Sequence, residues 1–65
     1  MSELLIKRLK NSIGLEGIVY LVNGFRFECK IISCDGEFLE FYDIKKSKVK
    51  IVKISEISEV DLNGK

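Results

Sequence analysis

The N-terminal stretch of the chain places its apolar residues at the spacing of one helix face, with basic residues on the other side. Ser2 can cap the start of such a helix, and Asn11 and Gly14 favour its end. The apolar residues expected to face the rest of the protein are Leu5, Ile6, Leu9 and Ile13. The pattern predicts a helix over residues 2–12, which must pack on the rest of the chain because it is too short to be stable alone.

After this helix the chain has the pattern of short β-strands. Residues 18–22 are β-branched and aromatic, and in residues 25–31 apolar side chains alternate with charged ones. The pairs Asn23-Gly24 and Asp35-Gly36 are turn signals, and the first predicts a type I′ turn with both residues left-handed. The strands predicted from these patterns cover residues 18–22, 25–31, 37–43, 49–54 and 57–62.

A helix followed by five short strands predicts a mainly β fold. A sheet this small has no room for two separate layers, so we expect a strongly bent antiparallel sheet that closes into a small, SH3-type barrel. Residues 1–65 then form one domain, with the barrel over residues 16–62 and a loose tail at 63–65. The first and last strands need partners, and head-to-tail pairing with the next copy of the chain would supply them.

With 65 residues the protein buries a modest core, and domains of this size usually need a further source of stability. Cys29 and Cys34 are five positions apart, so on one strand they would point to opposite faces, which disfavours a disulfide. Two thiols without any His cannot fill a tetrahedral zinc site, and we expect no metal or cofactor. Free thiols, no signal peptide and no membrane-spanning apolar run favour a cytoplasmic protein. Oligomerisation is then the expected source of stability.

The net charge of +1 argues against a nucleic-acid binder that relies on electrostatics alone. It leaves room for RNA binding through stacking and hydrogen bonds. Basic residues gather near the N-terminus and again in residues 45–53, and the simplest interpretation of such runs is a pair of solvated faces. There is no glycine-rich phosphate loop, and no Ser or Cys has an identifiable base partner, so we expect that the protein is not an enzyme.

Residues 20–24, Tyr-Leu-Val-Asn-Gly, resemble the strand and turn of the Sm and LSm superfamily, most closely its Hfq branch of bacterial and archaeal proteins. Further matches to the family pattern are Phe25, Arg26, Ile31, Ser33, Asp35 and residues 57–60. The resemblance implies an Sm-like barrel that carries an N-terminal helix and assembles into a homo-oligomeric ring, a hexamer before a heptamer. It also implies an RNA chaperone or scaffold that binds single-stranded RNA.

Hfq proteins bind A-containing RNA on the face opposite the helices. The resemblance carries this distal-type site onto Tyr20, Leu21, Asn23, Gly24, Phe25 and Arg26. Tyr20 would stack on a base, Gly24 would let a base approach the backbone, and Arg26 would meet a phosphate. The alternative is structural: Tyr20 as a core or interface side chain, Phe25 as a cover for the barrel end, and a turn that needs its Asn and Gly in any case.

The uridine pocket on the pore side of the family fits this sequence poorly. Its candidate residues here are Asp35, Gly36, Glu37 and Phe38. Glu37 stands where the family has a stacking aromatic residue, and it would repel phosphate. Phe38 could stack only after a one-residue slip, and the alternative is burial in the core. The resemblance therefore predicts a preference for A-rich over U-rich RNA.

Other departures from the family concern the scaffold. Cys29 stands where the family usually has Gly at the sharpest bend, and extra residues occur between the third and last strands. The candidates for a basic rim that anneals RNA strands are Lys7, Arg8 and Lys10. The alternative is that these residues form the solvent-exposed face of the amphipathic helix. The alternative function is a small β-barrel ring or SH3-like module for protein–protein contact without nucleic acid. The near-neutral charge and Glu37 favour that alternative.

Overall fold

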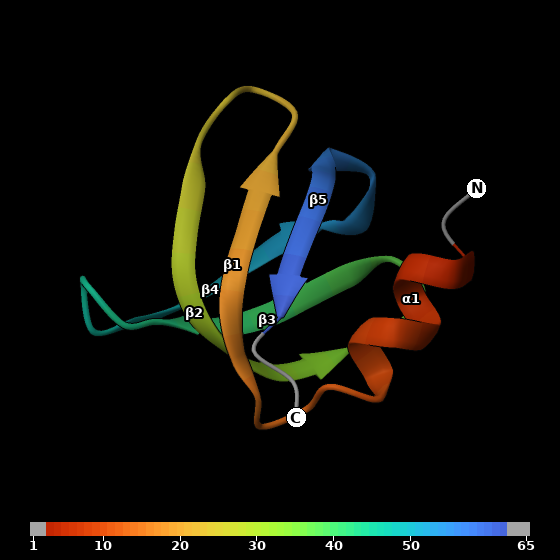
Figure 1. The fold of residues 1–65 in the computed structure, drawn as a ribbon, viewed down its shortest axis with the longest axis horizontal. Helices are drawn as coiled ribbons and strands as arrows, with labels where there is room; N and C mark the ends of the chain where they lie inside the picture. The colour runs from red at the N-terminus through yellow and green to blue at the C-terminus, as the bar shows by residue number, and fades with distance from the viewer. Residues whose placement is uncertain (1–2, 63–65) are drawn as a thin grey trace.

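One helix is followed by five antiparallel strands in a computed structural model of the protein, which describes residues 3–62 (Figure 1). The elements are α1 (Glu3–Lys10), β1 (Glu16–Leu21), β2 (Arg26–Cys34), β3 (Phe38–Asp43), β4 (Lys48–Lys53), the 3₁₀ turn η1 (Ile54–Glu56) and β5 (Ile57–Leu62). The mainly β fold class is therefore confirmed, and β5 has the predicted bounds. The predicted cap at Ser2 and the predicted tail at 63–65 lie outside the described residues.

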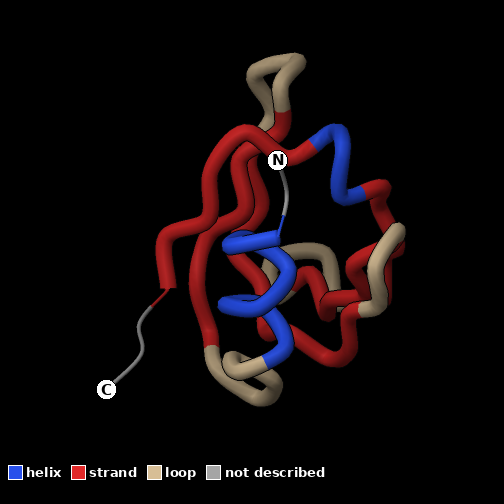
Figure 2. The backbone as a smooth tube through the Cα atoms, turned by 90° about the vertical axis from the view of Figure 1, so that its right-hand side faces the viewer, coloured by secondary structure: helices blue, strands red, loops and turns tan. Residues whose placement is uncertain are grey.

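The strands form one sheet in the order β4-β3-β2-β1-β5, and every neighbouring pair is antiparallel. The sheet is strongly bent (Figure 2), but within residues 3–62 β4 and β5 do not pair, so the expectation of a closed barrel is wrong. The reason lies in η1, which turns the chain away from β3 and delivers β5 to β1. Two backbone hydrogen bonds fix this turn, from Ile54 N to Glu37 O at 2.9 Å and from Val22 N to Glu56 O at 2.8 Å.

α1 lies next to the end of β2 (Figure 1), and the hydrophobic core draws residues from α1, β1, β2, β3, η1 and β5. The apolar core residues that are fully or nearly buried are Leu9, Val19, Cys29, Ile31, Leu39, Phe41, Ile54 and Ile57. Leu9 is the buried contact of the helix, as its apolar face predicts. Ile13 is an exception with 49% exposure, because α1 ends at Lys10 and Ile13 falls in the following turn.

No helix in the described part of the chain is long and apolar enough to cross a membrane.

An irregularity in β2 changes which way its last residues point. Ile31 pairs with Phe41 and Ser33 pairs with Glu40, so Ile32 is an extra residue without a partner in β3. This bulge resets the alternation of the strand, and Cys34 packs against the same core in which Cys29 is buried. The prediction that the two thiols point to opposite faces is therefore wrong. The break also lies beyond Cys29, the position at which the resemblance places the sharpest bend.

The turn between β1 and β2 departs from the predicted type I′ geometry. Gly24 has a positive φ of 96°, but Asn23 does not, so one residue is left-handed and not two. Gly24 N donates to Leu21 O at 3.0 Å, and Leu21 N donates to Phe25 O at 2.8 Å. These bonds close a three-residue loop in which Gly24 takes the left-handed position. Such loops are among the most common hairpin connections after the two-residue loops.

Candidate nucleic-acid interface

The β1–β2 turn presents the first candidate side chain to solvent. Asn23 Oδ1 accepts a hydrogen bond from Phe25 N at 3.0 Å, so the Asn side chain is used to hold the turn. Phe25 follows directly and is 64% exposed. Leu21 instead packs against the core, so its side chain serves the fold. Within the predicted distal-type site the exposed residues are thus at the turn and at the start of β2.

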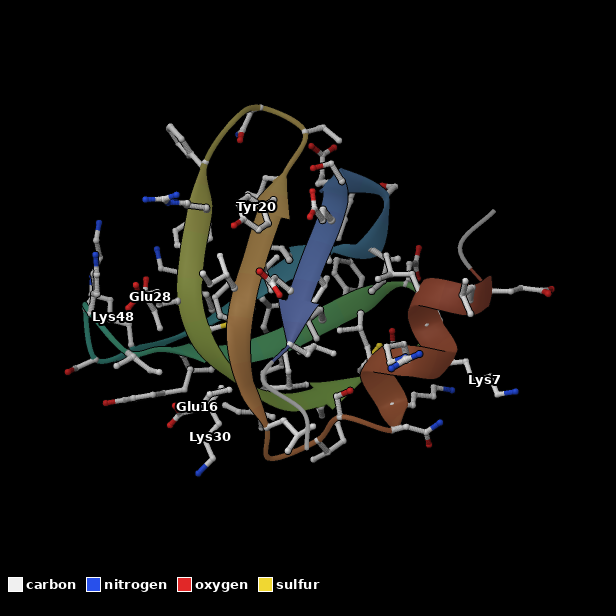
Figure 3. The ribbon with its side chains drawn as sticks, viewed as in Figure 1. Lys7, Glu16, Tyr20, Glu28, Lys30 and Lys48 are labelled. Carbon is white, nitrogen blue, oxygen red and sulfur yellow. The ribbon has the colours of Figure 1, made fainter. Side chains whose placement is uncertain are left out.

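Tyr20 is half-buried near the hairpin end of β1 (Figure 3). It lies opposite Arg26 of β2 on one side and opposite Glu59 of β5 on the other, and side chains of such pairs share a face. Its carbonyl accepts a hydrogen bond from the Ser58 hydroxyl at 3.3 Å. The structure therefore brings Tyr20 and Arg26 together as predicted, but it also places a carboxylate beside them.

A groove of about 380 Å³ opens next to this hairpin, and we call it the hairpin groove. Its lining residues are Phe25, Arg26, Phe27, Glu28, Asp43, Lys45, Lys46 and Lys50. Lys50 Nζ lies 5.0 Å from the ring centroid of Phe27, which in turn lies 5.7 Å from that of Phe41. The groove thus combines aromatic surface with several cations, the usual composition of a site for single-stranded nucleic acid.

Three lysines of this groove were missed as site residues. They are visible in the sequence as part of a basic run, but that run is typical of a solvated face. Only the pairing of β3 with β2 and β4 brings Lys45, Lys46 and Lys50 to the side of Phe25. No local signal in residues 45–53 indicates this proximity.

Asp43 is a further residue of the hairpin groove that was not predicted from the sequence. It is 2% exposed, and it sits opposite Cys29 in the β2–β3 pair. Its Oδ1 accepts a hydrogen bond from Lys46 N at 3.2 Å, while its Oδ2 is buried and has no partner among residues 3–62. Burial, with the Asp43 carboxylate as a second cause, raises the pKa of the Cys29 thiol to about 11. Cys29 is therefore a neutral thiol at physiological pH.

The pore-side candidates lie in the turn between β2 and β3. Asp35 Oδ1 accepts hydrogen bonds from Phe38 N and Glu37 N, both at 2.8 Å, and these bonds hold the pKa of Asp35 below its ordinary 3.8. Glu37 and Gly36 are exposed. Phe38 is 39% exposed, so it does not lie in the core, and it lines a shallow groove of about 310 Å³ that also contains Asp35 and Glu40. Two carboxylates therefore line the groove of this aromatic residue, and Lys53 lies directly opposite Phe38 in the β3–β4 pair.

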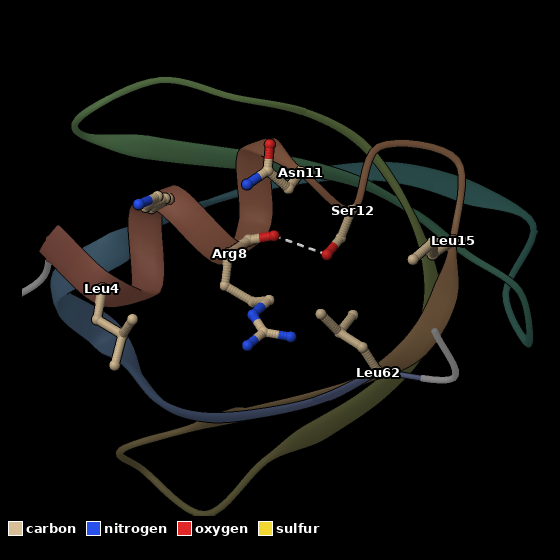
Figure 4. Close-up of a pocket in the computed structure, with 7 residues that line it drawn as sticks. Leu4, Arg8, Asn11, Ser12, Leu15 and Leu62 are labelled. Carbon is tan, nitrogen blue, oxygen red and sulfur yellow. Dashed lines mark hydrogen bonds between the residues drawn. The ribbon is translucent and has the colours of Figure 1, made fainter. Parts of the chain in front are cut away.

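The three residues of the predicted basic rim do not form one patch. Lys7 and Arg8 line a groove of about 630 Å³ between α1 and the end of β5, with Leu4 and Leu62 among its apolar walls (Figure 4). Ser12 Oγ donates to the carbonyl of Arg8 at 2.6 Å across its floor. Lys10 lies instead where its charge acts on Cys34 and Asp35.

No protein-family model matches the chain, and no curated protein matches it significantly. Residues 3–62 hold no group of three or more His, Cys, Asp or Glu side chains that could bind a metal ion.

Proposed function

We propose that the protein is an Hfq-like or Sm-like ring subunit that binds single-stranded RNA and acts as an RNA chaperone or scaffold. The observation that carries this proposal is the exposed ring of Phe25 beside the cationic hairpin groove, on the hairpin for which the resemblance also predicts RNA binding. Bases would stack on Phe25 and Tyr20, and Arg26 and the groove lysines would meet phosphates. The carboxylates of Asp35 and Glu40 in the groove of Phe38 support the preference for this face over the pore side.

Assembly into a ring is supported by the two unpaired sheet edges. β4 carries Lys48, Lys50 and Lys53, whereas β5 carries Glu59 and Asp61. Pairing β4 of one copy with β5 of the next would satisfy the backbone groups of both edges and would bring opposite charges together. A hexamer is the first expectation and a heptamer the second, on the resemblance. Such a ring repeats the hairpin site along one RNA strand, so modest sites add through effective concentration.

A second function is favoured by one specific observation. Glu59 lies directly opposite Tyr20, and Glu28 and Asp61 lie on either side of Ile18 in the same part of the sheet. These carboxylates repel RNA phosphates near the predicted stacking platform. They favour the alternative of a barrel that contacts proteins without binding nucleic acid.

The deciding experiment combines the mass of the protein in solution with titrations of labelled oligo(A) and oligo(U) of equal length at two salt concentrations. We expect a ring, tighter binding of oligo(A), and weaker binding at the higher salt. Tyr20→Ala should lower the affinity for oligo(A) about tenfold, because it removes one stacking face. Tyr42→Ala is the matched control, since Tyr42 is an exposed tyrosine on β3 outside the predicted site.

The other outcomes separate the alternatives. A ring without affinity for either RNA supports a structural or protein-binding ring. A monomer without affinity supports an SH3-like interaction module. Equal or tighter binding of oligo(U) contradicts the assignment of RNA to the hairpin face.

A further inference from the structure

The hairpin groove contains a buried carboxylate with one unused oxygen. Asp43 is 2% exposed, and while Oδ1 is bound by Lys46 N, Oδ2 has no hydrogen-bond partner. Buried polar atoms without a partner are rare in native proteins, because burial removes their hydrogen bonds to water and no protein hydrogen bond offsets that free-energy cost. The position of Asp43 in the lining of the groove makes a ligand the natural source of the missing donor.

The surroundings of Asp43 decide what kind of donor fits. Arg26, Lys45, Lys46 and Lys50 line the same groove, and their positive charges oppose a metal cation. A neutral N–H donor is not repelled in this way. The same cations attract an anionic group, and the exposed ring of Phe25 offers a flat apolar surface. The complementary ligand therefore has a neutral donor at one end, a planar middle and a negative charge at the other end, as a nucleotide has.

We infer that the hairpin groove binds one nucleobase that carries an exocyclic amino group, and that Asp43 Oδ2 accepts a hydrogen bond from this group. The base stacks on Phe25, and its phosphate lies against Lys45 and Lys46. These lysines are exposed, and the inference requires that their side chains leave room for the base to reach Oδ2. This inference rests on the proposed binding of RNA and adds to it the residue that selects the base.

The selection follows from the donors on each base. Adenine, cytosine and guanine each present an amino group at the edge of the ring, and this group can reach a single acceptor oxygen. Uracil has one ring N–H, which lies between two carbonyl oxygens. If this N–H pointed at Asp43, the two carbonyl oxygens would lie close to the carboxylate and would be repelled by it. Because Oδ1 of Asp43 is already occupied by Lys46 N, only one acceptor is free, and a lone amino group is its best match.

This pocket does not follow from the family resemblance. One of its walls comes from the loop between β3 and β4, which supplies Lys45 and Lys46. That loop lies in the stretch where extra residues separate the sequence from the family pattern. The assignment of Asp43 therefore depends on its own burial and hydrogen bonding.

The first test changes the ligand and leaves the protein intact. Binding of oligo(A) is compared with binding of an equal oligomer of purine riboside, which is adenosine without its exocyclic amino group. We expect the purine oligomer to bind about tenfold more weakly, since a hydrogen bond to a charged acceptor is lost. Equal affinity of the two oligomers would overturn the inference.

The second test exchanges the acceptor for a donor. Asp43→Asn keeps the size of the side chain and can keep the bond to Lys46 N, but it places an NH₂ group where Oδ2 was. We expect the preference for oligo(A) and oligo(C) over oligo(U) to fall at least tenfold, with a gain for oligo(U). Glu16→Gln is the control, because it removes a carboxylate at an exposed position outside the hairpin groove, and it should leave the preference unchanged.

The outcomes distinguish this inference from the proposed function. If wild-type protein binds none of the oligomers, the proposed function fails. If it binds RNA but Asp43→Asn leaves base preference unchanged in a variant with native circular dichroism, the base pocket fails and RNA binding stands. An equal change in Glu16→Gln would also overturn the role of Asp43, because it would assign the effect to charge alone.

Discussion

The turn between β1 and β2 and the turn between β2 and β3 use the same device to hold their backbone. In the first turn Asn23 Oδ1 accepts one N–H, from Phe25, and in the second Asp35 Oδ1 accepts two, from Glu37 and Phe38. Each turn is followed by a partly exposed phenylalanine. The two turns are therefore close in construction, although they lie at different ends of β2.

Their surroundings differ in charge. Phe25 is the more exposed of the two rings and borders the hairpin groove with its cations, whereas Phe38 shares its groove with Asp35 and Glu40. An aromatic residue after a turn is thus not sufficient to make an RNA site. The charges brought alongside by neighbouring strands and loops decide whether a phosphate chain can lie there.

The largest expected effect is a difference between the two aromatic residues in RNA binding. Phe25→Ala should weaken binding of oligo(A) by tenfold or more, because a base–aromatic stack is worth roughly 1–3 kcal/mol. Phe38→Ala should change the affinity by less than about twofold, since two carboxylates line its groove whereas four cations line the hairpin groove. Fluorescence anisotropy titrations of both variants measure this difference. Losses of equal size would break the comparison.

A smaller effect is expected from the glycines of the two turns. Gly24 has a φ of 96°, so Gly24→Ala should destabilise the protein by about 1–2 kcal/mol. Gly36 is outside the left-handed region, and an added Cβ would meet no atom within 4 Å. Gly36→Ala should therefore be neutral or stabilise by about 0.5 kcal/mol through the unfolded state. Urea unfolding at one protein concentration tests both, and a larger loss for Gly36→Ala would contradict the turn geometry.

The smallest effect separates the two turns by their response to acid. Because two hydrogen bonds lower the pKa of Asp35, its contribution to stability is complete above the ordinary value of 3.8 and is lost as the pH falls through the lowered pKa. The amide of Asn23 does not titrate. Asp35→Asn should therefore flatten the stability profile below the ordinary pKa of Asp35, whereas Asn23→Ala should cost about 1 kcal/mol at every pH. Urea midpoints measured from neutral to acid pH show whether the profiles divide in this way.

The sequence allowed the order and type of the elements to be predicted, because alternation and helical spacing are local signals. Residues 57–62 form a strand with the predicted limits, and residues 27–31 follow the predicted alternation, whereas Phe25, predicted on the same face, is exposed. The turn at Asn23 was assigned one left-handed residue too many, since the same dipeptide also suits a three-residue loop. The error at Cys34 has another cause: a bulge has no residue type of its own.

The candidate site was predictable only in part. The hairpin residues Tyr20 and Arg26 do lie together, because they are close in sequence and paired in the sheet. Lys45 and Lys46 line one groove with Arg26 through tertiary structure, which no window of the sequence contains, and Tyr20 is not among the residues that line this groove. The burial of Asp43 could not be foreseen for the same reason, since a carboxylate at the end of a strand is usually solvated.

The extra residue Ile32 has a consequence for insertions and deletions. If Ile32 is removed, Ile31 and Ser33 become neighbours, and the in–out alternation from Cys29 to Cys34 becomes that of a regular strand. The bulge, and the added twist that bulges bring, thus depends on the number of residues in β2 and not on the identity of any side chain. A point substitution at this site would keep the bulge, whereas the loss of one codon would remove it and flatten the sheet.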